Sequence, residues 1–228
     1  MRVKKYFIIM ILLIGMLSCK TNKIDDYELK TLYEIFDELI ERINPKICFL
    51  EPPIPPIYDS NHNLIKYDSV EYQRIIDEIE KNNQKIIDSI GVIAVVDSLF
   101  TCYNNVDIKY IKSNLTEHGY IEALNAMTDS SIIGRPLDLS KIKNIEGYEL
   151  RYYSEFPENM EIWKRDNYNF FFLGILGISR IYFDSSRQFG LIYCYTICTR
   201  HWGGGTIVCI RKIDDKWTIE EMIDLGVS

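Results

Sequence analysis

The sequence predicts an α+β fold in which amphipathic helices from the N-terminal half pack on an antiparallel sheet from the C-terminal third. Apolar residues recur at steps of three and four in two runs, residues 27–43 and 72–87. The last third instead consists of short β-branched and aromatic runs separated by turn residues. A hydrophobic share of 47% and an aromatic share of 13% favour a folded domain over a disordered chain.

Residues 1–18 have the pattern of an export signal. The apolar run 6–17 fits the ~7–15 residues of a signal-peptide core and is too short for the ~20 residues that span a bilayer. It follows a stretch that contains no acidic residue and three cationic ones, Arg2, Lys4 and Lys5.

The end of this run, Ser18 followed by Cys19, resembles the lipobox of bacterial lipoproteins. The resemblance implies that the chain is cut before Cys19, that the Cys19 thiol carries a diacylglycerol and that the new amine is acylated, for example by palmitate. Two or more acyl chains anchor a protein stably, whereas one holds it only marginally. Met16 stands where the lipobox usually has Leu, and an ordinary secretory signal is the alternative.

Lys20 bears on the address of the mature chain. In lipoproteins of two-membrane bacteria an Asp at this place often means retention in the inner membrane, so Lys20 is compatible with the outer membrane of the cell envelope. Removing residues 1–18 takes away cations and no acid, so the mature chain is more acidic than the formal charge of −7. An acidic chain repels phosphate backbones, which argues against nucleic acid as a partner.

The mature chain is predicted to form a lipidated tether over 19–26 and one α+β domain over 27–228. An amphipathic helix is expected from Tyr27 to Ile43, with Glu28, Glu34, Asp37, Glu38 and Glu41 on its polar side. Since an acidic face is repelled by anionic lipid, this helix is expected to pack on the core rather than on a membrane. A stiff, extended, proline-rich connector over 44–60 leads to a second amphipathic helix from about Ser69 to Gly91.

The remaining elements are shorter. The β-branched run 92–96 predicts a buried strand, Asn104-Asn105 a turn, and 115–128 and 138–146 short helices. An antiparallel meander is expected from strands 170–183, 189–198, 206–213 and 216–221, with Thr199–Gly205 as a loop and Trp217 facing the core. Gly174 and Gly177 predict that the first of these strands is bent or bulged.

The C-terminal segment resembles that of uncharacterised secreted bacterial proteins. The resemblance is carried by Ser179–Phe183, Leu191–Tyr195, Cys198, Gly203, Gly205, Lys212, Trp217 and Ile219, and it implies a strand register without an activity. By element order, the fold is analogous to the curved sheets over helices of cystatin-like and nuclear-transport-factor-2-like (NTF2-like) proteins.

With Cys19 lipidated, an odd number of cysteines remains: Cys48, Cys102, Cys194, Cys198 and Cys209. Export permits disulfides, and a bridge between the strands of Cys194 and Cys209 is one alternative, a buried free thiol the other. The spacing of Cys194, Cys198 and His201 is similar to that of metal ligands, but cysteines four apart on a strand stand roughly 13 Å apart. His62 and His118 lie far away in sequence, so we expect neither a metal nor a cofactor.

Arg200, His201 and Trp202 are the candidate binding residues, because a large aromatic at a loop tip often contacts a sugar face or a protein partner. The alternative is that Trp202 folds back over the sheet. The glycines that follow are similar to an oxyanion loop, yet the chain has no G-x-S-x-G nucleophile motif, so they are better explained as hairpin glycines.

These observations favour a membrane-anchored, non-enzymatic binding domain whose partner is an envelope protein or glycan. The rival hypothesis is a hydrolase of envelope glycan or peptide that uses two carboxylates, which would have to face each other about 5–10 Å apart in one cleft. A third hypothesis is a structural or inhibitory partner of another envelope protein, for which a contiguous apolar patch would be the sign.

Overall fold

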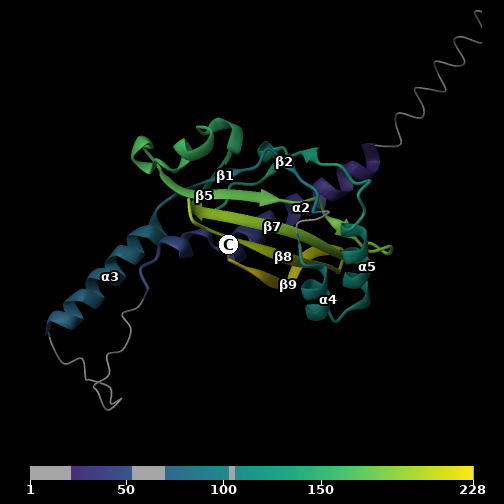
Figure 1. Cartoon of the computed structure of the whole chain (residues 1–228), viewed down its shortest axis with the longest axis horizontal. Coiled ribbons are helices and arrows are strands. Elements are labelled where there is room, and N and C mark those ends of the chain that lie inside the picture. Colours follow the sequence, from purple (N-terminus) through teal and green to yellow (C-terminus); the bar gives the residue numbers. More distant parts are fainter. Residues whose placement is uncertain (1–21, 53–69, 103–105, 228) are drawn as a thin grey trace, which may run out of the picture.

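The structure is a computed structural model that describes residues 22–52, 70–102 and 106–227, and it confirms the α+β class. The predicted signal peptide 1–18, Cys19, His62 and Asn104-Asn105 lie outside the described residues. One large sheet has the strand order β4 (Tyr148–Tyr152), β1 (Gly91–Val95), β5 (Phe171–Ile178), β7 (Phe189–Thr199), β8 (Trp202–Ile213) and β9 (Lys216–Val227), with β6 (Tyr182–Phe183) beside β7 (Figure 1). A separate two-stranded sheet pairs β2 (Ser98–Leu99) with β3 (Arg135–Pro136).

The large sheet is mixed, whereas the sequence predicts an antiparallel one. Strand β1 pairs in parallel with both β4 and β5. The strands β5, β7, β8 and β9 form an antiparallel series, and β6 also pairs antiparallel with β7. All five residues of β1 are buried, as expected for a strand that has neighbours on both sides and cover on both faces. The short run 92–96 reveals a buried strand but carries no signal of its direction.

The predicted strand 170–183 is divided into β5 and β6, and it is bulged where its first glycine lies. The register of β5 against β1 shifts between Val92 and Ile93, opposite Gly174, whose φ is 138°. This conformation is accessible mainly to glycine. The bulge predicted from Gly174 is therefore confirmed.

Helix α2 (Asn22–Ile43) lies on one face of the sheet and begins at Asn22 rather than at Tyr27 (Figure 1). Its apolar side chains pack against those of β1, β5, β7, β8 and β9; the buried ones are Leu32, Ile35, Phe36, Leu39 and Ile40. Trp217 is 5% exposed within this core, as the sequence predicts. The helix ends at Ile43, and the next residue, Asn44, has a left-handed φ of 44° and precedes Pro45.

The opposite face carries α4 (Ile108–Asn114) and α5 (His118–Met127), which pack against β7, β8 and β9 (Figure 1). The short 3₁₀ helices η3 (Tyr153–Glu155), η4 (Asn159–Trp163) and η5 (Arg165–Asn167) belong to the segment whose side chains pack on β1 and β5. Instead of a helix over 138–146 there is only the 3₁₀ turn η2 (Leu139–Lys141), which the Asp138 side chain caps.

Helix α3 (Val70–Asp88) does not pack on the sheet, contrary to the prediction, but projects away from it (Figure 1). No side chain described in α3 is fully buried, and Ile75 and Ile87 are exposed. Its C-terminal end is held by Lys46, whose Nζ donates to the carbonyls of Ile87 at 2.6 Å and Ser89 at 2.7 Å. Lys46 belongs to a 3₁₀ helix, η1 (Pro45–Phe49), inside the connector predicted to be extended.

Glu28 corrects the predicted polar face of the first helix. Its side chain is buried, and its Oε1 accepts hydrogen bonds from the Arg180 Nε at 2.9 Å and from the Ile181 N–H at 2.6 Å. Arg135 adds a longer contact of 3.5 Å to Oε2. A buried carboxylate requires such partners, and this one joins α2 to the segment between β5 and β6.

Asp184 lies in the turn between β6 and β7. Its carboxylate is expected to make the free energy of unfolding depend on pH in the acidic range. Burial raises the pKa of Asp184, but hydrogen bonds from the Ser186 hydroxyl and from the N–H groups of Phe189, Gln188 and Ser186 outweigh it, so the pKa is below the ordinary 3.8. The carboxylate therefore stabilises the fold at neutral pH, and this contribution is lost as the pH falls through the lowered pKa.

We expect Asp184→Asn to lower the free energy of unfolding by roughly 1–2 kcal/mol at pH 7 and by less at pH 3. Urea denaturation of both proteins at the two pH values measures this. The exposed Asp166, changed to Asn, is the control and should show no such pH dependence. A deficit of Asp184→Asn that is equal at pH 7 and pH 3 would contradict the role given to the charge.

Candidate functional site

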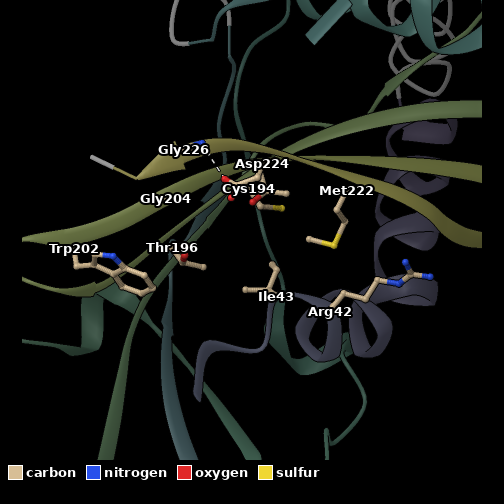
Figure 2. A pocket seen from close by; sticks show the side chains of 10 residues that line it. Arg42, Ile43, Cys194, Thr196, Trp202, Gly204, Met222, Asp224 and Gly226 are labelled. Carbon is tan, nitrogen blue, oxygen red and sulfur yellow. Dashed lines mark hydrogen bonds between the residues drawn. The ribbon is translucent and has the colours of Figure 1, made fainter. Parts of the chain in front are cut away.

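A cavity of about 290 Å³ lies where α2 ends above the sheet (Figure 2). Helix α2 contributes Arg42 and Ile43, and the three strands contribute Cys194 and Thr196 of β7, Trp202, Gly204 and Thr206 of β8, and Met222, Asp224 and Gly226 of β9. Its volume is near the lower end of the ~300–1,000 Å³ of small-ligand sites. It can hold one ring or one large side chain.

The cavity exists because the residues on one face of the sheet change in size along the strands. Under α2 this face carries bulky side chains such as Ile192, Val208 and Ile210, which are fully buried. Beyond the helix the same face carries the pairs Thr196–Gly204 and Thr206–Asp224. A Cβ at Gly204 would meet only the Gly226 carbonyl oxygen, at 3.4 Å, so glycine leaves the floor of the cavity open.

Two charged residues and one aromatic residue stand around this floor. The guanidinium of Arg42 is fixed by bonds from Nε to Glu38 at 2.9 Å and from Nη2 to the Ile219 carbonyl at 2.7 Å. Asp224 is exposed, and its Oδ1 accepts the Gly226 N–H at 2.9 Å. Trp202 stands on the side of the cavity opposite Arg42 (Figure 2). The site thus combines an indole face, two hydroxyls and one charge of each sign.

Of the three predicted binding residues, the structure brings only Trp202 to the cavity, where its side chain stays 44% exposed. Arg200 and His201 form an exposed two-residue turn between β7 and β8. The predicted loop Thr199–Gly205 is therefore wrong except at Arg200 and His201, because Thr199 belongs to β7 and Trp202–Gly205 belong to β8.

Close packing rather than positive φ explains two of these strand glycines. A Cβ at Gly203 would lie 2.8 Å from the Thr196 carbonyl oxygen, and one at Gly205 would lie 2.8 Å from the Tyr193 ring. If the turn is assigned to Arg200-His201, the alternation of side chains along the two strands places Thr196, Gly204 and Thr206 on one face of the sheet. This alternation is the signal in the sequence for the part of the site that was not predicted.

The structure pairs Cys48 with Cys198, a bridge that the sequence does not predict. It ties η1, directly after α2, to β7 beside the cavity. The expected bridge between Cys194 and Cys209 is not formed: Cys194 pairs with Thr206 and Cys209 with Leu191, so the two thiols lie on opposite faces.

The structure also places the free thiols and the residues whose spacing is similar to that of metal ligands. Cys102, Cys194 and Cys209 are buried and free, and burial raises the pKa of Cys102 to about 11 and that of Cys209 to about 12. They are therefore protonated at neutral pH.

Because Cys198 is in a disulfide, the residues of the C-x3-C-x2-H spacing do not form a metal site. The described residues contain no group of three His, Cys, Asp or Glu side chains that could hold a metal.

A second cavity, of about 650 Å³, lies on the opposite face of the same strands. Its lining includes Val106, Asp107 and Tyr110 at the start of α4, together with Tyr193, Gly205 and Leu225 of the sheet. Asp224 and Gly226 border both cavities. The C-terminal part of β9 therefore separates two hollows, one on each face.

The buried carboxylates of the described residues, Glu28 and Asp184, lie outside both cavities. Glu28 is bound to Arg180, and the pKa of Asp184 is lowered, which is opposite to what a general acid needs. The rival hydrolase hypothesis requires two carboxylates that face each other in one cleft, and neither Glu28 nor Asp184 supplies such a carboxylate.

No protein-family model, curated protein or solved structure matches the chain. Within residues 22–52, 70–102 and 106–227, no helix has the length and apolar character needed to cross a bilayer.

Proposed function

We propose that this protein is a binding domain, without catalytic activity of its own, held by lipid on Cys19 at the outer membrane of a two-membrane bacterium. Its ligand site is the cavity between the end of α2 and strands β7, β8 and β9. The observation that carries the proposal is the pairing of an open, small-residue floor with a half-exposed tryptophan at the mouth. Half-exposed aromatic residues beside a hollow are typical of recognition sites.

The chemistry of the lining supports an amphipathic ligand that comes from an envelope peptide or glycan. The Trp202 indole and the Ile43 and Met222 side chains offer apolar contact, while Thr196 and Thr206 offer hydroxyls that donate and accept. The fixed Arg42 guanidinium costs little further ordering when a polar group binds it.

The proposed location in the cell envelope rests on the sequence around Cys19. A disulfide between Cys48 and Cys198 is compatible with this location, because such bonds persist after export and rarely in the cytosol.

We expect Cys19→Ala to move most of the protein from the membrane pellet to the soluble fraction, since the acyl chains provide the anchor. Immunoblotting of fractionated cells and the intact mass of the processed chain measure this. Ser18→Ala, which keeps a small residue before the thiol, is the control and should stay in the pellet. Wild-type protein with no acyl mass would contradict the anchor.

The cavity is tested separately with the full-length protein in detergent micelles. N-acetylated amino-acid amides and monosaccharides at millimolar concentration should shift the NMR signals of the Trp202 indole and of the Thr196 and Thr206 amides. Gly204→Leu places a side chain in the open floor, so we expect at least a ~10-fold loss of binding with the melting temperature almost unchanged. Lys216→Leu adds the same side chain at the exposed far end of β9 and should bind as wild type does. Shifts scattered over the surface, or equal in both variants, would contradict the site.

A further inference from the structure

Strand β9 is an edge of the large sheet, and α2 covers only its first part. The Trp217 N–H donates to the Glu34 carboxylate at 3.1 Å, and the Ile219 N–H donates to that of Glu38 at 3.3 Å. Arg42 donates to the Ile219 carbonyl at 2.7 Å. Side chains of the helix thus occupy the outward N–H groups of Trp217 and Ile219 and the Ile219 carbonyl, as natural proteins commonly protect an edge strand.

The outward backbone groups of the second part of β9 have no such cover. Alternate residues of an edge strand bond to the neighbouring strand and point away from it. The register of β9 shifts by one residue opposite Cys209 and Ile210, so that Glu221 and Ile223 face β8, and Met222 and Asp224 point outward. Among the described residues, neither the N–H nor the carbonyl of Met222 or Asp224 has a hydrogen-bond partner outside β8.

This open edge borders the cavity, since Met222 and Asp224 belong to both. An extended peptide that lay beside Met222 and Asp224 could form hydrogen bonds with their free N–H and carbonyl groups. Every second side chain of this peptide would point toward the α2 face of the sheet, where one of them could enter the cavity. The exposed charges along this part of β9 are acidic: Glu221 and Asp224, together with Glu220, whose carboxylate is already paired with Arg211 and bonded by the Tyr120 hydroxyl. They favour basic residues in the added strand.

We infer that the ligand is an extended peptide of another protein that carries basic residues and adds to β9 as a further strand at Met222–Asp224. One of its apolar side chains enters the cavity beside Trp202. This inference rests on the proposed function and names the ligand of the same site. A second copy of the chain is a poorer occupant, because two β9 edges would bring the acidic side chains of both strands onto one ladder.

The first test uses the full-length protein alone. Amide hydrogen exchange followed by NMR should find the Trp217 and Ile219 amides exchanging at least ~100-fold more slowly than those of Met222 and Asp224. Slow exchange at Met222 and Asp224 in the monomer would overturn the open edge. The same protection accompanied by a dimer in analytical ultracentrifugation would overturn it in favour of self-pairing.

The second test uses a display library of random ~10-residue peptides selected on the same protein. Enriched peptides should carry Lys or Arg together with an apolar residue, and binding should slow exchange at both Met222 and Asp224. Asp224→Ala removes the carboxylate but keeps the N–H, whereas Asp224→Pro also removes the N–H, a change that an outward edge position tolerates. We expect the Ala variant to bind about 3-fold more weakly and the Pro variant at least ~30-fold more weakly.

Three results would overturn the inference. They are equal binding by the Ala and Pro variants, peptides that shift Trp202 without protecting the two amides, and a selection that enriches no peptide. If the amino-acid amides or monosaccharides still bind the cavity in any of these cases, the proposed function stands and only strand addition is lost. If nothing binds the cavity while the two amides exchange freely, the proposed function itself is wrong.

Discussion

Replacing Glu28 by alanine is expected to lower the free energy of unfolding by about 3–5 kcal/mol. The carboxylate is 3% exposed, and it receives hydrogen bonds from Arg180 and from the Ile181 N–H. Its removal leaves a guanidinium that is largely withdrawn from water without its counter-charge, and it leaves a buried backbone donor unsatisfied. Both costs fall on the contact that joins α2 to the segment after β5.

Chemical denaturation followed by circular dichroism measures this loss. The matched control is Asp37→Ala, which removes a carboxylate from the same helix where the described residues include no hydrogen-bond or ion-pair partner for it. We expect the control to change stability by less than ~0.5 kcal/mol. Equal effects of the two substitutions would show that the Glu28 contacts do not stabilise the fold.

Gly174→Ala is expected to destabilise the protein by at least ~3 kcal/mol. At φ 138° an alanine is strained, and its Cβ would collide with the Ile197 carbonyl oxygen, a backbone atom of the neighbouring strand β7 that cannot move independently. The change therefore has to disturb the bulge where the parallel and antiparallel halves of the sheet meet.

Gly226→Ala separates strain from collision. Gly226 also has a positive φ, of 88°, but a Cβ there meets no atom within 4 Å. We expect a loss of only ~1 kcal/mol for this variant, measured by the same denaturation experiment. A loss for Gly174→Ala that is no larger than that for Gly226→Ala would contradict the close approach of β5 and β7.

The α+β class follows from periodicity, but much of the arrangement does not. The run 92–96 identifies a buried strand, yet pairing partners far along the chain decide that it lies parallel between β4 and β5. The periodicity of residues 70–88 indicates a helix with an apolar side but does not say that this side stays away from the sheet. Glu28 has the polar character of a solvent-facing residue, and only the tertiary fold supplies Arg180 beside it.

The candidate site was predicted through one residue, Trp202. Arg42 and Asp224 reach the cavity from segments far apart in sequence, so no local pattern joins them. The three consecutive glycines concealed the rest, because glycine serves equally in a loop and in a strand that neighbouring atoms approach closely, as they do at Gly203 and Gly205. The bridge between Cys48 and Cys198 likewise depends on η1 returning to β7 after α2 ends.

The proposal that the end of the sheet beside Trp202 is the binding surface is tested by site-specific photo-crosslinking in living cells that produce the protein. A photoreactive phenylalanine derivative is placed at Trp202 and, as a control, at Ile213, which is also exposed but lies at the opposite end of β8. We predict a discrete adduct from position 202, mapped by mass spectrometry to one extended, basic peptide segment, and none from position 213. Adducts of equal yield from both positions, or from position 213 alone, would contradict the claim.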